Sequence, residues 1–452
     1  MLKVKNEVNM TEGPFLKKIV VFIIPLILTG LLQCLYNAAD IAVVGQFRGD
    51  IALAAVGSTS SLTNLIVGLF MGISIGAGVI VARYKGEGNP NMLRRSVHTA
   101  FGLSVIAGFL VMIIGLLVSP AILRWMDTPP TVIEYSILYI RIIFLGMPAL
   151  MVYNFCAAMV RSVGDTKTPL IFLAISGILN VLLNLMFVAL FGMGVEGVAL
   201  ATIISQYFSC VLIIVYMYKN TASMQLRFKE VRLELGIIKT MLYIGIPSGI
   251  QSSLFSLSNM MLQSAVNGLG DVVMAGSTAA GSIEGFIYIA MNALYQTSLT
   301  FIGQNVGAGR YKNIKKILPL CVALVTAVGL IGSLGVLLFR DFFLGLYIPE
   351  GGLALEAGIE RLWIVLPLYF LCGVMETFTG ALRSMGKSIT AMVIALFFAC
   401  VLRIVWVKVI FPHPASLTVI FISYPITWFL AAACGLAVFV RTYKKLTLDK
   451  PR

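Results

Sequence analysis

The sequence predicts an all-α integral membrane protein, with twelve transmembrane helices in two six-helix lobes related by a parallel internal repeat. Three observations predict this fold class. Hydrophobic residues make up 59% of the 452 residues and charged residues only 12%. Long stretches without any charge recur along the chain, and the second half repeats features of the first at an offset of about 222 residues.

The number of spans follows from the length of the apolar stretches. A transmembrane helix needs about 20 mainly apolar residues, and twelve such stretches are present, six in each half. Because an even number of spans returns the chain to its starting side, both halves have one orientation, and their symmetry axis should run along the membrane normal. The predicted spans begin near Ile19, Ile51, Val97, Val132, Pro169, Val195, Ile237, Val272, Ile314, Leu362, Ile389 and Ala415.

The internal repeat sets the predicted domains. A near-constant offset over most of each half is hard to obtain by chance. We expect an N-terminal lobe over 1–218, a cytoplasmic linker over 219–239, which is the longest polar interruption, and a C-terminal lobe over 240–452. The residues that pair at the offset of 222 are Lys17 with Lys239, Pro25 with Pro247, Asn37 with Asn259, and Arg161-Ser162-x-Gly164 with Arg383-Ser384-x-Gly386.

The formal charge of +14 reflects topology. Of the 33 Lys and Arg residues, 26 lie in the two tails and in every second loop. This asymmetry predicts a multi-pass membrane protein with both termini in the cytoplasm, and it leaves little basic charge for nucleic acid. The exceptions are Arg141 and Arg403 inside spans, and Arg48, Arg124, Arg340, Arg361 and Lys408 in the other loops.

Enzymatic chemistry is not expected. The seven cysteines all lie in predicted spans without metal-ligand spacing and are typical of small packing residues. No phosphate-binding loop is present, and no nucleophile, base or metal constellation can be assembled. The sequence therefore predicts a protein that is not an enzyme and has no bound cofactor.

Glycines and prolines within the spans suggest close packing and bending. Gly68, Gly72 and Gly76 recur every four residues in the second span, and this pattern favours close helix packing over a ligand role. Pro25 and Pro247 occupy the same place in the first span of each half. A proline removes one backbone hydrogen bond, so each is predicted as a hinge, although packing alone could tolerate it.

Polar residues inside the spans of the first half form a candidate ion site. Asp40, Asn180, Asn184 and Thr202 come to similar depth in the outer half of the membrane, at 1.5 Å rise per helical residue. Their oxygens could hold Na⁺, or burial could tune Asp40 to accept a proton. Alternatively, Asp40 caps a helix end and the asparagines pack between helices. Buried ionisable residues usually serve function, so we favour the ion site.

The second half breaks the symmetry. Glu284 and Glu376 supply carboxylates in the eighth and tenth spans, and Arg403 supplies a cation in the eleventh. Glu376 either attracts a cationic substrate or pairs with Arg403 as a structural ion bridge. Glu284 has the same two interpretations.

Five segments occur in a characteristic order and spacing: Leu35-Tyr36-Asn37-Ala38-Ala39-Asp40 within Pro25 to Gly45, Ala54-Ala55-Val56-Gly57, Arg161-Ser162-Val163-Gly164-Asp165-Thr166-Lys167-Thr168-Pro169, Gly303-Gln304-Asn305-x-Gly307-Ala308-Gly309 and Gly380-Ala381-Leu382-Arg383-x-Met385-Gly386. In these segments, and over almost its whole length, the chain resembles multidrug and toxic compound extrusion (MATE) transporters of the bacterial kind. The resemblance implies a location in the inner (plasma) membrane.

The resemblance implies two six-helix lobes, alternating access, and export of amphipathic organic cations against an inward Na⁺ or H⁺ gradient. By position, Asp40, Asn180, Asn184 and Thr202 match the family's cation-site residues. Some relatives carry acids in the seventh span and higher in the tenth, whereas this chain has none in the seventh. A second-lobe Na⁺ site is therefore not expected, and the coupling ion stays open.

Two other classes of membrane protein fit the sequence less well. A lipid-linked oligosaccharide flippase of the same superfamily would need several cations for pyrophosphate, and the spans offer only Arg403 and Arg141. No selectivity-filter repeat points to an ion channel. The expected partners are small organic cations and membrane lipids, without nucleic acid, and the expected state is a monomer.

Overall fold

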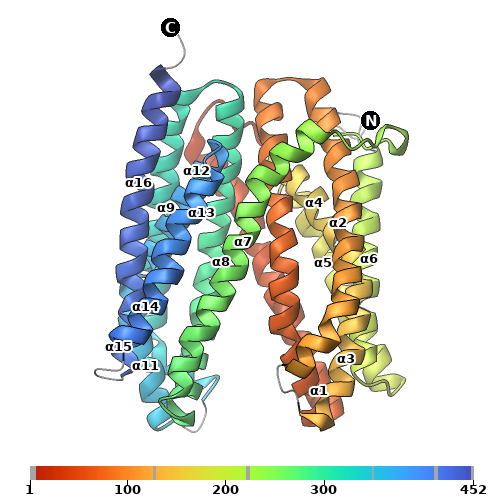
Figure 1. Cartoon of the computed structure of the whole chain (residues 1–452), viewed down its shortest axis with the longest axis vertical. Helices are drawn as coiled ribbons and strands as arrows, with labels where there is room; N and C mark the ends of the chain where they lie inside the picture. The colour runs from red at the N-terminus through yellow and green to blue at the C-terminus, as the bar shows by residue number, and fades with distance from the viewer. Residues whose placement is uncertain (1–6, 126–128, 220–223, 349–350, 412–415, 449–452) are drawn as a thin grey trace. The chain divides into compact units, whose positions relative to one another are not determined.

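The structure is a computed structural model that describes residues 7–125, 129–219, 224–348, 351–411 and 416–448. Helices account for nearly all of these residues (Figure 1). The helices of the first half are α1 (Phe15–Glu87), α2 (Pro90–Trp125), α3 (Pro130–Leu145), α4 (Met147–Ser162), α5 (Lys167–Asn184), η1 (Leu185–Leu190) and α6 (Val195–Lys219).

A short turn of 3₁₀ helix, η2 (Phe228–Glu230), lies in the linker. The second half repeats the series with additional short helices. Its elements are α7 (Leu235–Asn267), α8 (Asp271–Gly307), α9 (Tyr311–Leu338), α10 (Arg340–Gly345), α11 (Leu353–Val365), η3 (Leu366–Leu368), α12 (Phe370–Ser384), α13 (Ser388–Leu396), η4 (Phe397–Val401), α14 (Leu402–Val409), α15 (Leu417–Phe421) and α16 (Ser423–Leu448).

The structure confirms the predicted fold class. Within the described ranges, nine helices are long and apolar enough to cross a membrane, and two bent helix pairs raise the number to eleven. Helix α1 contributes two of these spans, on either side of a break at Gly49, where φ is 74°. The remaining span is α7, a 33-residue helix whose polar residues include the buried Gln251 and Ser258.

The bent pairs are a structural sign of the duplication. Helices α3 and α4 meet at 46° around Gly146, and α11 with η3 meets α12 at 46° beside Tyr369. These two positions are separated by 223 residues, close to the offset of the sequence repeat. The fifth span of each half also contains a π-helical segment, η1 in the first half and η4 in the second. The repeat therefore extends to local irregularities of the helices.

The chain separates into two compact units. The boundary between them falls inside α1 and again inside α7, so each of these helices contributes to both units. Unit 1 has the bounds Met1–Asn9 and Ile24–Gly249, and unit 2 has Met10–Ile23 and Ile250–Arg452. Compared with the lobes predicted from the sequence, the first turns of α1 group with unit 2 and the first turns of α7 with unit 1. Both exchanges occur within three residues of Pro25 or Pro247.

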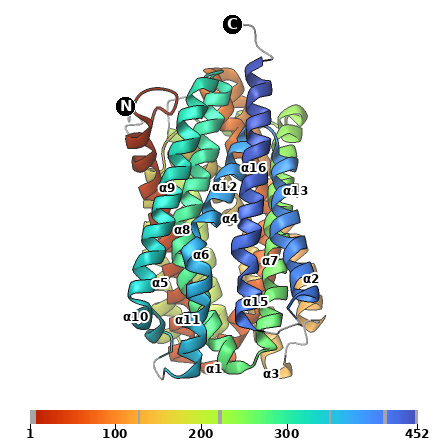
Figure 2. The ribbon, with the colours of Figure 1, turned by 90° about the vertical axis from the view of Figure 1, so that its left-hand side faces the viewer.

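Each unit is a helical bundle. In unit 1, α2 packs against α3 and α4, and α6 packs against α3, α4 and α5. In unit 2, α8 packs against α9, α11 and α12, and α12 also contacts α16 (Figure 2). Large side chains such as Phe144 and Phe155 in unit 1 and Phe301 and Phe421 in unit 2 are fully buried in these bundles.

The glycines of the second span provide close packing, as the sequence predicts. A Cβ atom added to Gly72 would lie 2.1 Å from the backbone nitrogen of Gly249 in α7, and one added to Gly76 would lie 2.2 Å from the backbone oxygen of Met241. No real Cβ atom approaches a backbone so closely. Small residues therefore allow the second span and the start of α7 to touch through their backbones.

The linker is attached to α2 by polar contacts. The backbone nitrogen of Arg227 donates to His98 Nε2 at 3.0 Å, Arg94 pairs with Glu230, and Arg95 Nε donates to Glu234 Oε1 at 2.7 Å. His98 is thus a structural acceptor whose Nδ1 contacts the Arg94 carbonyl.

Candidate functional site

The acidic cluster of unit 1 consists of Asp40, Asn180, Asn184 and Thr202, from three helices. Asp40 projects from the first span in α1, and Thr202 lies about two turns into α6. The two asparagines occupy the last turns of α5, directly before the π-helical segment η1. Such segments often accompany functional sites.

Hydrogen bonds join the four side chains. Asn184 Nδ2 donates to Asp40 Oδ1 and, at 3.3 Å, to Asn180 Oδ1. Thr202 Oγ1 donates to Asp40 Oδ2 at 3.3 Å. The structure therefore brings together all four residues predicted from their depth, and it excludes the alternative in which Asp40 only caps a helix end, because α1 continues beyond it. Their role as cation ligands stays a prediction.

The cluster borders a cavity of about 360 Å³ within unit 1. Asp40, Asn180 and Thr202 line this cavity, and sequence reasoning missed several further polar lining residues, among them Asn154 of α4 and Gln206 of α6. Gln206 follows Thr202 by one turn, so its helical spacing could have revealed it. No Lys or Arg is among the described lining residues. The cavity therefore presents a single negative charge surrounded by amides and hydroxyls.

One oxygen in the cluster has no protein partner. Asn184 is fully buried, and its Oδ1 accepts no hydrogen bond from any described residue. A buried acceptor without a donor is costly. This amide oxygen, the Asp40 carboxylate and the Thr202 hydroxyl are all of the hard oxygen type that cations such as Na⁺ prefer, and Asn184 contacts Asp40 through its Nδ2.

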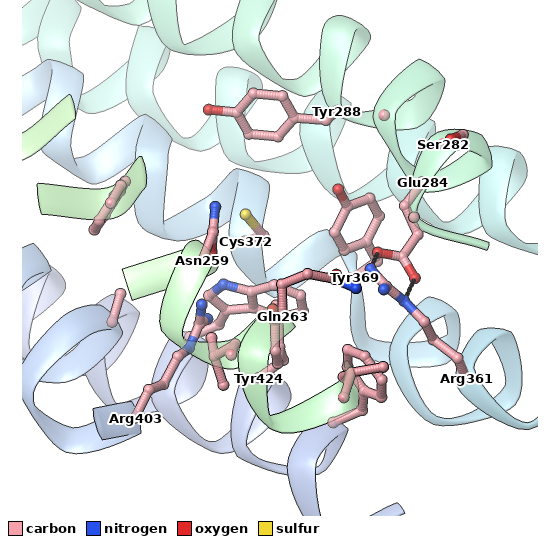
Figure 3. Close-up of a pocket in the computed structure, with 18 of the residues that line it drawn as sticks. Asn259, Gln263, Ser282, Glu284, Tyr288, Arg361, Tyr369, Cys372, Arg403 and Tyr424 are labelled. Atoms are coloured by element: carbon pink, nitrogen blue, oxygen red, sulfur yellow. Dashed lines mark hydrogen bonds and ion pairs between the residues drawn. The ribbon is translucent and has the colours of Figure 1, made fainter. Parts of the chain in front are cut away.

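Unit 2 encloses a second and larger cavity, of about 500 Å³, which we call the unit 2 cavity (Figure 3). It lies between α7, α8, α12 and α14, with α11, α15 and α16 completing its wall. Four aromatic residues form one connected wall: Tyr369 contacts Trp428, which contacts Tyr424, which contacts Phe421. Glu284, Arg361, Glu376 and Arg403 all line this cavity. Apolar and aromatic walls with a few polar groups are typical of small-molecule sites.

Glu284 is already paired. Arg361 Nε and Nη2 donate to the two oxygens of Glu284 at 2.8 and 2.7 Å, and Arg361 Nη1 donates to the backbone oxygen and the hydroxyl of Ser277 at 2.9 Å each. The prediction that Arg361 lies in a loop is wrong. The tenth span begins nine residues before Leu362, at Leu353, so Arg361 lies inside it, where Glu284 neutralises its charge.

Glu376 and Arg403 do not form the ion bridge that was one of the two sequence interpretations. Arg403 Nε donates instead to Thr427 Oγ1 at 3.0 Å, and its guanidinium carbon lies 4.0 Å from the ring centre of Tyr424. Glu376 is buried and forms no ion pair with any residue that the structure describes. Its carboxylate therefore lacks an ion-pair partner, whereas Glu284 has one, and the nearest compensation is the charge of the buried Arg383 two turns later on α12.

The two predicted hinge prolines lie inside continuous helices, Pro25 in α1 and Pro247 in α7. Thr29 Oγ1 donates to the Pro25 backbone oxygen at 2.7 Å. Each proline lies within three residues of the position at which its helix passes from one unit to the other. A hinge at either position stays a prediction.

A duplicated helical protein with a polar cavity among the membrane spans of each unit belongs to the class of polytopic membrane transport proteins. The MatE family model matches residues 25–186 and again residues 247–409, once in each half. The chain belongs to the MATE family of efflux transporters.

Named relatives agree with this membership. A probable multidrug resistance protein of Bacillus subtilis, YoeA, is 28% identical over 384 residues, which cover 83% of this chain and 82% of the relative. The multidrug export protein MepA of Staphylococcus aureus is 21% identical over 97% of this chain and 96% of its own length. An outward-facing structure of a multidrug resistance MATE transporter superposes with a TM-score of 0.91 at 21% identity, covering 99% of this chain and all of the other.

Proposed function

We propose that this protein exports amphipathic organic cations by alternating access and that the inward movement of a cation bound at the acidic cluster drives the export. The observation that carries the proposal is Asp40, a carboxylate inside a membrane span that contacts only amides and a hydroxyl. Intramembrane acids without a basic partner commonly serve ion pathways. The names of YoeA and MepA, which refer to multidrug resistance and export, support organic compounds as cargo.

Na⁺ is our first candidate for the coupling ion. A bound Na⁺ would satisfy the unpartnered Asn184 Oδ1, whereas a proton on Asp40 would leave that oxygen without a donor. H⁺ is the second candidate because Asp40 is the only acid of the cluster. The flippase alternative receives no support, since Arg361 is neutralised and only Arg403 remains open among the described lining residues.

Dye export by proteoliposomes tests the function and separates the ions. An inward Na⁺ gradient at equal pH and an inward H⁺ gradient without Na⁺ should be imposed separately. We expect the Na⁺ gradient to drive export of a cationic dye above the rate of protein-free liposomes. Export driven only by the H⁺ gradient would assign the coupling to protons, and no response to either gradient would contradict the proposal.

We further propose that the protein works as a monomer in the plasma membrane with both termini in the cytoplasm. The basic residues concentrate in the tails and alternate loops, which supports this orientation. In a background without native cysteines, Gln225→Cys should be protected from an impermeant thiol reagent in intact cells. Phe191→Cys, in a predicted outer loop, should be modified. The reverse pattern would invert the topology.

A further inference from the structure

We propose that the unit 2 cavity contains a carboxylate-binding subsite at Arg403, which holds the carboxylate of aromatic ligands that also carry a cationic group. The inference deepens the proposed export function and rests on it for its biological use, although binding itself can be measured independently. Arg403 would receive the carboxylate, and Glu376 would receive the cationic group.

The first step is the incomplete hydrogen bonding of Arg403. The residue is 5% exposed and lines the cavity. Its Nε donates to Thr427, but neither Nη atom donates to any residue in the described part of the chain, and Nη2 is among the buried atoms without a partner. A guanidinium has five N–H donors that favour planar, bidentate acceptors.

The second step concerns how the protein tolerates this charge. The guanidinium carbon lies 4.0 Å from the ring centre of Tyr424 and 5.4 Å from that of Trp428. Cation–π contacts stabilise a desolvated guanidinium through its faces. Hydrogen bonds use its edge, which lies in the plane of the group. The aromatic rings therefore stabilise the buried cation through its faces and leave the hydrogen-bonding capacity of its Nη edge unused by the protein.

Arg361 can be compared with Arg403, because it is also a buried arginine that lines this cavity and stacks on an aromatic ring. Its guanidinium carbon lies 4.3 Å from the ring centre of Phe421. Glu284 and Ser277 occupy its nitrogens. In Figure 3 this pair lies at one side of the cavity and Arg403 at the other. The fold thus provides a carboxylate partner for one arginine and none for the other.

The charges of the cavity select the kind of ligand. Glu284 and Arg361 neutralise each other, so among the described lining residues one guanidinium, Arg403, and one carboxylate, Glu376, have no ion-pair partner. Arg383 acts on Glu376 from outside the lining. A ligand with one charge of each sign balances both, and a carboxylate fits the guanidinium edge with two parallel hydrogen bonds. A dianionic phosphate would leave excess negative charge close to Glu376. The wall that includes Tyr369 and Trp428 suits an aromatic body.

The test uses two dyes that differ only in the carboxylate. Rhodamine B carries a free carboxylate beside its cationic ring system, and in its ethyl ester that carboxylate is blocked. Binding is measured by fluorescence anisotropy on the full-length protein in phosphatidylcholine nanodiscs, with empty nanodiscs subtracted. We expect the wild type to bind the acid about tenfold more tightly than the ester, because a charge-assisted hydrogen bond is formed only with the acid.

Substitution of Arg403 locates the preference. In Arg403→Met the acid should lose its advantage while the ester binds at least as well as before, so the ratio of the two affinities isolates the pairwise contact. Lys408→Met removes an exposed cation from the same helix, α14, and should keep the wild-type ratio. Arg403→Lys retains the positive charge but not the paired N–H donors of the guanidinium, so it should give an intermediate affinity ratio. It replaces the Met variant as the test if that variant does not fold.

Equal or weaker binding of the acid by the wild type would overturn the subsite, as would a full acid preference in Arg403→Met. These outcomes are distinct from failure of the proposed function. If the protein prefers the acid but shows no gradient-driven export, the subsite stands and the export function fails. If it exports the ester but does not prefer the acid, the export function stands and the subsite fails.

Discussion

The two units use the same helical frame for different polar chemistry. The unit 1 cavity contains one carboxylate, Asp40, surrounded by amides and a hydroxyl. The unit 2 cavity is larger and contains two carboxylates, two guanidiniums and a connected aromatic wall. The difference teaches that duplication preserved the spans, their bends and their π-helical segments, while the side chains diverged. On the proposed function, the first cavity binds the coupling cation and the second binds the organic cargo.

The largest expected effect separates the two cavities at Asp40. Asp40→Asn should reduce gradient-driven export to the rate of protein-free liposomes, because an amide neither titrates nor offers full negative charge to an ion. The variant should still elute as a monodisperse protein. Asp271→Asn, which alters an exposed acid in the first turn of α8, is the matched control and should transport normally. Wild-type export by Asp40→Asn would remove the acidic cluster from the mechanism.

A second prediction concerns the paired acid of unit 2. Arg361→Met leaves Glu284 buried and unpaired, which should destabilise the protein by about 3–5 kcal/mol. Thermal melting in detergent would measure the change. Adding Glu284→Leu to this variant should restore most of the stability, since no buried charge then remains. A single variant as stable as wild type would show that the ion pair is not needed.

The unpaired acid should behave differently. Glu376→Gln should melt close to wild type, because no ion pair is broken, and should bind the ethyl ester of rhodamine B about tenfold more weakly through loss of one charge contact. Equal affinity of the variant and the wild type would place the cation elsewhere. A large loss of stability would instead indicate a structural role for Glu376.

The smallest effect is expected for an ion pair outside the membrane. The hydrogen bond from Arg95 lowers the pKa of Glu234 below its usual range. A lowered folded-state pKa means that the contact stabilises the protein above the unfolded pKa of Glu234 and is lost as the pH falls through its folded pKa. Because the pair is largely exposed to solvent, Glu234→Gln should melt like wild type at neutral pH. A marked destabilisation would show that the linker contributes more than a surface contact.

Much of the fold could be predicted from the sequence because spans are long and apolar. The acidic cluster could also be predicted, since the regular rise of straight helices places Asp40 level with Asn184 and Thr202. The start of the tenth span could not, because Arg361 ends the apolar run although Glu284 neutralises it. Which acid pairs with which arginine depends on the rotation of α8, α11 and α14 about their axes, which apolar length does not determine.

The central claim is that unit 1 binds the coupling ion and unit 2 binds the cargo. Equilibrium dye binding without Na⁺ tests this claim most directly. The affinity for the ethyl ester of rhodamine B should be measured in potassium buffer for the wild type, Asp40→Asn and Glu376→Gln. If the cargo binds in unit 2, Asp40→Asn should bind the dye like the wild type, and Glu376→Gln should bind it about tenfold more weakly. Loss of dye affinity in Asp40→Asn, with Glu376→Gln unchanged, would contradict the account by placing the cargo in the unit 1 cavity.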